Sequence, residues 1–224
     1  MKFGENGPGE TRRGFLKVGL ATAAGVVIAP ALHAASGPLM PSILSLPHRF
    51  GPGVDGVRPA LLARARAALA QHAAQITHPE LVGIADFTRQ SAEPRFHMVD
   101  MTSGRVTSFL VAHGRGSDPE HSGWVQYFSN SLGSFATSRG AYVTGERYSG
   151  KYGLSLRLAG LDYSNDRALE RAIVVHGAPY VSEQMIRDYG KLGRSEGCFA
   201  VPQTDLYGVL ARLTPGHMIY ADKA

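Results

Sequence analysis

The spacing of apolar residues changes along the chain and predicts one helix followed by a series of strands. Over residues 59–76 apolar positions recur near the helical period, and Pro59 suits a first helical turn. After Pro79 the pattern becomes short β-branched runs separated by Gly, Ser, Pro or Asn, which is typical of strands. These runs cover residues 81–87, 95–101, 106–112, 141–144, 154–158, 172–176 and 217–221.

Two short helices are expected late in the chain, over residues 182–189 and 204–213. Ser182 suits the N-cap of the first of these helices, and Gly190 suits the position past its end. Residues 117–140 contain many Ser and Gly without periodicity and read as irregular loops. We therefore predict a mainly-β domain with a helix near its start and short peripheral helices.

Residues 1–34 have the pattern of an export signal. Paired arginines, Arg12 and Arg13, precede an Ala- and Gly-rich apolar run, and no Asp, Glu, Lys or Arg occurs between Lys17 and Arg49. The paired arginines resemble a twin-arginine signal, which exports folded proteins. We expect export to the periplasm, with membrane contact only through this signal. A retained membrane anchor is the alternative, because the run is nearly long enough to span a bilayer.

The remaining chain divides into a segment over residues 35–58, rich in Pro, Gly and Ser, and a folded domain over residues 59–224. The first reads as a linker or an extended entry segment. The formal net charge is +5, of which the signal carries +2, from four basic and two acidic residues. No dense stripe of Lys and Arg with interleaved aromatics occurs, so we expect no nucleic-acid partner.

The sequence has a single cysteine, Cys198, which excludes an internal disulfide framework and a cysteine zinc finger. In an exported protein a lone thiol is buried, paired with another chain or used as a nucleophile. His176 ends an apolar strand and could activate such a thiol as its base. Gly197 lets the backbone pass close to a substrate, where consecutive N–H groups could form an oxyanion hole.

These residues resemble a known family. His176-Gly177 followed by Ser195-Glu196-Gly197-Cys198 is similar to the active-site motif of the YkuD-like L,D-transpeptidases, and in particular of murein L,D-transpeptidase catalytic domain proteins. Longer similar stretches extend the resemblance over roughly residues 81–220, and it implies the β-sandwich fold of that family. Glu196 departs from the wider family, which usually has a second histidine there, and the gap after His176-Gly177 is longer.

The resemblance implies chemistry on the stem tetrapeptide of peptidoglycan. Cys198 would attack the third-residue carbonyl, expel D-alanine and form a thioester, and an amine of another stem would resolve it into a 3→3 cross-link. His176 would act as base and then acid, and the Gly177 carbonyl would orient its ring. The N–H groups of Gly197 and Cys198 would hold the oxyanion, and Ser195 would shape the turn. Water as acceptor would make the protein an L,D-carboxypeptidase instead.

Four further residues are candidates for substrate contact: Arg194, His113, Tyr180 and Asn130. Arg194 suits a substrate carboxylate because guanidinium binds carboxylates through two hydrogen bonds. A solvated charge for this arginine, and ordinary packing for the others, are the alternatives. His113 also ends a strand before a glycine, so it is a second candidate for the base.

We expect no metal and no cofactor, because the spacing of His113, His121 and His176 fits no zinc pattern. Two other functions stay open. The protein could be a wall-binding protein that has the same fold but has lost catalysis. Glu196, which departs from the family motif, keeps this alternative open. A papain-like cysteine peptidase is less favoured, because in those enzymes the cysteine precedes the histidine. The sequence does not indicate an oligomeric state.

Overall fold

The computed structural model describes residues 50–51 and 56–224, which contain one nine-stranded sheet and three α-helices. The expected export signal and most of the expected linker lie outside the described residues. In chain order the elements are β1 (Phe50–Gly51), α1 (Pro59–Gln71), β2 (Leu81–Asp86), β3 (Phe96–Asp100), β4 (Val106–Phe109), a 3-10 turn (Arg115–Ser117), β5 (Gly140–Gly150), β6 (Gly153–Gly160), β7 (Val174–Ala178), α2 (Glu183–Tyr189), β8 (Phe199–Pro202), α3 (Leu206–Arg212) and β9 (Met218–Asp222).

The sheet has the strand order β1-β4-β3-β2-β9-β5-β6-β7-β8. Most neighbouring strands are antiparallel, but two pairs are parallel, β2 with β9 and β7 with β8. The β7–β8 crossover contains α2, which follows from the rule that parallel neighbours need a long connection. The last strand of the chain therefore lies inside the sheet, between β2 and β5.

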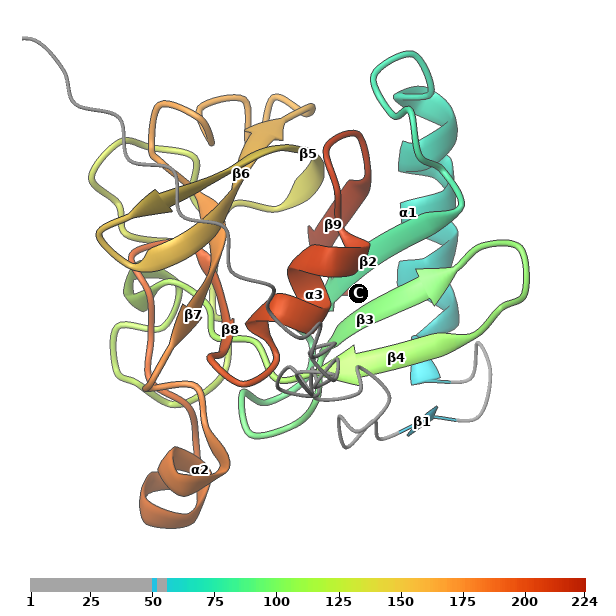
Figure 1. Ribbon diagram of the computed structural model, residues 1–224. Helices are drawn as coiled ribbons and strands as arrows, with labels where there is room; N and C mark the ends of the chain where they lie inside the picture. Colours follow the sequence, from blue (N-terminus) through green and yellow to red (C-terminus); the bar gives the residue numbers. More distant parts are fainter. Residues whose placement is uncertain (1–49, 52–55) are drawn as a thin grey trace, which may run out of the picture. The chain divides into compact units, whose positions relative to one another are not determined.

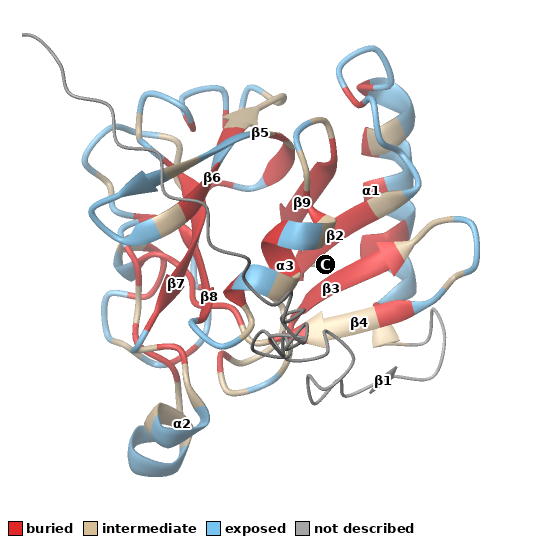
Figure 2. Cartoon of the chain, viewed as in Figure 1, coloured by how far each residue is buried: buried red, intermediate tan, exposed pale blue. Residues whose placement is uncertain are grey.

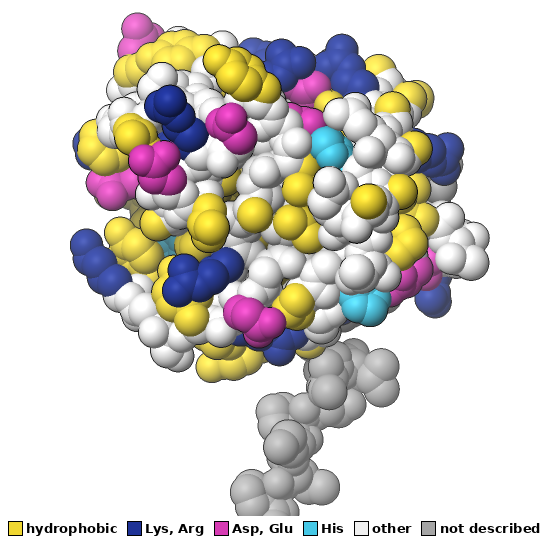
Figure 3. Space-filling model, turned by 90° about the horizontal axis from the view of Figure 1, so that it is seen from above, with side chains coloured by type: hydrophobic (Ala, Val, Ile, Leu, Met, Phe, Trp, Pro, Cys, Tyr) yellow, Lys and Arg dark blue, Asp and Glu magenta, His cyan; other side chains and the backbone are white. Residues whose placement is uncertain are grey.

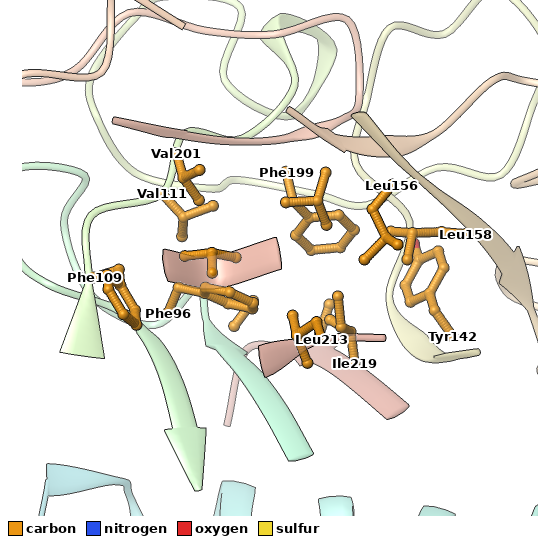
Figure 4. Close-up of a cluster of buried hydrophobic side chains, with 14 of the residues drawn as sticks. Phe96, Phe109, Val111, Tyr142, Leu156, Leu158, Phe199, Val201, Leu213 and Ile219 are labelled. Atoms are coloured by element: carbon orange, nitrogen blue, oxygen red, sulfur yellow. The ribbon is translucent and has the colours of Figure 1, made fainter. Parts of the chain in front are cut away.

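One large core fills the space between the two halves of this sheet (Figure 1, Figure 2). Figure 4 shows side chains from β3, β4, β5, β6, β8 and β9 meeting in this core, together with residues that follow β4 and α3. The labelled members are Phe96, Phe109, Val111, Tyr142, Leu156, Leu158, Phe199, Val201, Leu213 and Ile219. The opposite face of β2, β3 and β9 is covered by α1, which buries Leu61, Leu62, Ala65 and Ala68. The helices α1 and α3 therefore lie on opposite faces of the central strands.

The mainly-β prediction is confirmed, with the early helix and the short later helices in their expected places. The two faces of the sandwich are halves of one continuous sheet. Helix α1 ends at Gln71, earlier than the apolar pattern suggested, because a turn at His72 redirects the chain, and Ile76 is buried outside the helix. Ser182 caps α2 by accepting a hydrogen bond from the Met185 N–H.

Two strands were missed: β1, which lies in the segment read as a linker, and β8. β8 is only four residues long and ends in proline, so its pattern is too short to be recognised from sequence. Among the described residues no helix combines the length and apolar character needed to cross a membrane.

Candidate active site

The strands β7 and β8 bring the His-Gly and Ser-x-Gly-Cys motifs together. Their parallel register places Val175 beside Phe199 and His176 beside Ala200. Val175 and Phe199 enter the core. Cys198 immediately precedes β8, and the alternation of side chains along an extended chain is expected to place it on the same side as His176. Strand spacing and rise place the two Cα atoms about 8 Å apart on a diagonal. That separation is within reach of an imidazole and a thiol, although no hydrogen bond joins the two side chains here.

The turn before Cys198 requires glycine at position 197. Gly197 has a φ of 117°, and a Cβ there would lie 2.7 Å from Ile173 Cδ1 and 2.8 Å from the Ala136 carbonyl. The Ser195 hydroxyl donates to the Cys198 carbonyl at 2.7 Å and accepts from the Gly197 N–H at 3.2 Å. Ser195 therefore holds the turn from within. The oxyanion role of the Gly197 N–H stays a prediction, because this N–H points to Ser195.

The segment after β4 forms a wall against this turn. Ala112 bridges Ala200, and the Ser195 N–H donates to the His113 carbonyl at 2.9 Å. A Cβ on Gly114 would lie 2.7 Å from the Gly197 Cα, so the two glycines allow the backbones into direct contact. The His-Gly pair at 113–114 thus supports the cysteine turn through its backbone.

The side chain of His113 points into the interior, where it is 1% exposed. Its Nδ1 accepts a hydrogen bond from the Arg95 guanidinium at 2.7 Å, and its Nε2 lies 3.3 Å from Asp118 Oδ2. Burial, together with the positive charge of Arg95, lowers the pKa of His113 to about 3. This geometry gives His113 a structural role. Neither the alternative role as base nor the predicted substrate contact finds support in it.

The thiol of Cys198 is largely buried. It accepts a hydrogen bond from the Val174 N–H, and its Sγ lies 3.6 Å from the Ala172 carbonyl. Burial raises the pKa of Cys198, and the negative charge of Glu196 adds to this effect, while the Val174 hydrogen bond and the positive charge of Arg171 oppose it. The resting Cys198 side chain is therefore a neutral thiol at neutral pH.

Arg171 is a site residue that sequence reasoning missed. Its guanidinium donates to the carbonyls of Ser129, at 2.8 Å, and Ala136 and so fastens the 126–139 loop beside the cysteine. Burial lowers the pKa of Arg171, whereas negative charge on Tyr142 or Cys198 acts in the opposite direction. Nothing in the local pattern of residues 161–173 marks this arginine, because its partners lie more than thirty positions away.

The imidazole of His176 is covered by a second missed residue. The ring of Tyr152, at the tip of the β5–β6 hairpin, stacks on it with centroids 4.8 Å apart. His176 Nδ1 lies 3.0 Å from the Gly177 carbonyl, which fixes the proton on Nδ1 and leaves Nε2 basic. Burial lowers the pKa of His176, against a smaller opposing effect of the Gly177 bond. The neutral ring is the form that can take a proton from the thiol.

The other three residues predicted to contact substrate are Tyr180, Arg194 and Asn130. Tyr180 packs on Gly193, and burial raises its pKa, with a smaller contribution from negative charge on Cys198, so its predicted substrate contact stays a prediction. Arg194 is engaged by the carbonyls of Asp118 and Pro119, the latter at 3.1 Å. Asn130 lies in the wall of a 490 Å³ cavity whose lining residues include neither His176 nor Cys198. The substrate contacts proposed for Arg194 and Asn130 stay predictions.

Glu196, which departs from the family motif, is exposed and forms an ion pair with Arg115 at 3.2 Å. The Arg115 guanidinium also lies 3.9 Å above the centre of the Phe135 ring. These contacts join the tip of the cysteine turn to the neighbouring loop. Figure 3 shows basic and acidic side chains interspersed on one face of the protein, without a field of one sign.

Comparisons with known proteins identify the family of the chain. A family model described as the L,D-transpeptidase catalytic domain matches residues 55–221. No curated protein gives a significant match. Similar solved structures include an L,D-transpeptidase from Xylanimonas cellulosilytica, with 15% identity over 65% of this chain and 62% of that one and a TM-score of 0.39. Another is from Mycobacterium smegmatis, with 13% identity, 64% and 58% coverage and a TM-score of 0.39.

L,D-transpeptidase 3 from Mycobacterium tuberculosis, in complex with a faropenem-derived adduct, has 14% identity, 65% and 61% coverage and a TM-score of 0.41. The matched region spans about three fifths of the length of each of these structures. The family match covers most of the present chain, including both motifs. The protein therefore belongs to the L,D-transpeptidase catalytic domain family, a family of enzymes.

Proposed function

We propose that the protein is a cysteine-dependent peptidoglycan L,D-transpeptidase. The observation that carries this proposal is the parallel pairing of β7 with β8, which brings His176, a histidine of fixed tautomer, near Cys198, the residue immediately before β8. A base with a free Nε2 beside a thiol is the arrangement that nucleophilic catalysis requires. Membership of the family supports peptidoglycan as the substrate.

The first half-reaction forms an acyl-enzyme. His176 Nε2 takes the proton of the Cys198 thiol as the sulfur attacks the carbonyl of the third residue of the stem tetrapeptide. The peptide bond to D-alanine breaks, and the imidazolium returns the proton to the departing amine. A thioester between Cys198 and the shortened stem remains.

The second half-reaction resolves the thioester. The side-chain amine of another stem attacks the thioester carbonyl, gives its proton to His176 and forms the 3→3 amide, and the sulfur leaves and recovers its proton. With water as the acceptor, the same steps yield a tripeptide and make the enzyme an L,D-carboxypeptidase.

The electrostatics of the site favour proton transfer during attack over a stable ion pair. Burial raises the pKa of Cys198 and lowers that of His176, so both groups rest in their neutral forms. Arg171 is the nearby cation, and it stabilises negative charge on the sulfur as the proton leaves. Deprotonation of the thiol is therefore coupled to the attack on the substrate.

We also propose that the protein is exported by the twin-arginine route and acts in the periplasm. The paired arginines and apolar run of residues 1–34 support this, as does a substrate that is part of the cell wall. Fusion of residues 1–34 to a reporter that is active only after export tests it. Loss of export when Arg12 and Arg13 are changed to lysine is the expected result, and unchanged export would contradict the route.

Mass spectrometry of products tests the proposed reaction. The protein is incubated with disaccharide tetrapeptide, with and without an amine acceptor. We expect release of D-alanine and a cross-linked product, and a covalent adduct with a carbapenem. Tripeptide alone would indicate the carboxypeptidase, and neither release nor adduct would favour a wall-binding protein without catalysis.

Two variants locate the chemistry. Cys198→Ala should abolish both release and adduct. Tyr207→Ala, at a tyrosine of α3 that is 73% exposed, serves as the folded control and should leave both unchanged. Unchanged D-alanine release in Cys198→Ala would rule out the proposed nucleophile.

A further inference from the structure

A second cluster of chemically active side chains lies where β2 and β9 begin. His78 and Glu80 precede β2, and His217 precedes β9, its parallel neighbour in the sheet. One ligand atom from each of the three residues lies within 4.8 Å of the others. The catalytic motifs are on β7 and β8 and contribute nothing to this cluster.

The distances suit a metal ion bound by two imidazoles and a carboxylate. Zinc binds such ligands at about 2.0–2.2 Å in a tetrahedron, which places the ligand atoms about 3.3 Å apart. The separation from His78 Nδ1 to Glu80 Oε1 is 3.3 Å, and that from His217 Nε2 to Glu80 Oε1 is 3.9 Å. Because His78 and Glu80 are exposed side chains, small rotations close the remaining gap.

The tautomer of His217 is set by its surroundings. Its Nδ1 lies 2.8 Å from the Thr214 carbonyl, which can only accept a hydrogen bond, so Nδ1 carries the proton. In this tautomer the lone pair of Nε2 faces the carboxylate of Glu80. Two acceptors that face one another repel unless a cation or a proton lies between them. Metal-bound histidines commonly donate their other N–H to a carbonyl in this way.

The backbone holds the two halves of the cluster together. The Gly216 carbonyl accepts from the N–H groups of Thr77, at 3.0 Å, and His78, at 3.1 Å. Gly216 has a φ of 94°, and a Cβ there would lie 1.9 Å from the Thr77 hydroxyl oxygen. Only glycine lets the two loops approach so closely. The site is thus built before any ion binds.

We propose that His78, Glu80 and His217 bind one divalent transition-metal ion of the zinc type, with the exposed fourth position open to water. The two rings are stacked with centroids 4.9 Å apart and an interplanar angle of 20°. Their donor set of two nitrogens and one oxygen suits zinc and its neighbours over calcium or magnesium, which prefer oxygen ligands. The ion fastens the start of β2 to the start of β9 and so stabilises the fold.

Metal titration in a Cys198→Ala background tests this proposal, because the thiol is a competing metal ligand. Chelator-treated protein of the full chain is titrated with Zn²⁺ by calorimetry and with Co²⁺ by absorption spectroscopy. We expect one ion per chain, tetrahedral Co²⁺ absorption and a higher midpoint of thermal unfolding in the presence of Zn²⁺.

The variants Glu80→Gln and His78→Gln change exposed ligands and should leave the fold intact. Each should weaken Zn²⁺ binding at least tenfold and remove the thermal shift, whereas Glu170→Gln, an exposed glutamate outside the cluster, should change neither. Absence of binding, or equal binding in all variants, would overturn the proposal. Since the background has no catalytic thiol, either result is independent of the proposed transpeptidase reaction.

Discussion

The buried His113 is expected to stay neutral far into the acidic range. Its Nδ1 accepts from Arg95, and a guanidinium can only donate, so the single ring proton is on Nε2, toward Asp118. A second proton on Nδ1 would break the bond to Arg95 and bring two positive charges together in the interior. These are the physical reasons why burial and Arg95 lower the pKa of His113 to about 3.

The stability of the fold should therefore depend on pH through this residue. The pKa in the unfolded chain is 6.5 and that in the folded protein about 3, so as pH falls below 6.5 only the unfolded state takes up the proton. The contribution of neutral His113 to stability is fully present above pH 6.5 and is lost as pH falls. One proton of difference corresponds to about 1.4 kcal/mol per pH unit, or about 2–3 kcal/mol over two units.

His113→Gln provides the comparison, because its amide oxygen can accept from Arg95 but does not titrate. Urea unfolding of both proteins is measured from about pH 7 down to about pH 4.5. Carboxylates that begin to take up protons near the lower limit are common to both proteins, so their contribution cancels in the comparison. We expect the wild type to lose about 2–3 kcal/mol more than the variant over this range. Parallel stability curves would refute the assignment of a neutral, buried His113.

Two further predictions concern the site. Gly197→Ala should lower the free energy of unfolding, measured in urea, by about 2 kcal/mol or more and slow carbapenem acylation, because the backbone at position 197 has a positive φ and is crowded. Gly133→Ala is the control, since Gly133 has a φ of 70° but no atom within 4 Å of the added Cβ, and it should lower the stability less. Equal losses of stability in the two variants would contradict the crowding argument. Tyr152→Ala should expose the His176 ring to water and so raise its pKa. The acid limb of the pH profile of kcat/KM should then move to higher pH. An unchanged acid limb would show that the Tyr152 ring does not shield His176 from water.

Many helices and strands of the fold could be predicted from the local pattern of the sequence. Helical spacing after Pro59, the Ser182 cap and the glycine at 190 depend on neighbours a few positions away, and the structure confirms each of these elements. The strands were found for the same reason, apart from β1, which has only two residues, and β8, which has four and ends in proline. The two motifs around His176 and Cys198 could be identified as candidates because their residue types are informative in themselves.

The tertiary structure decided which side chains lie next to His176 and Cys198. The order of strands brings Arg171 and Tyr152 to the cysteine and the histidine, and neither is marked by its own neighbours in the sequence. The same order takes His113 into the interior.

It also joins His78 to His217, residues that no ligand spacing in the sequence connects. The sequence by itself determined the helices, most strands and the reactive residue types, because hydrogen bonding within an element and side-chain periodicity are local. The partners, the burial and hence the pKa of each group depend on which distant strands become neighbours, and only the folded sheet sets that.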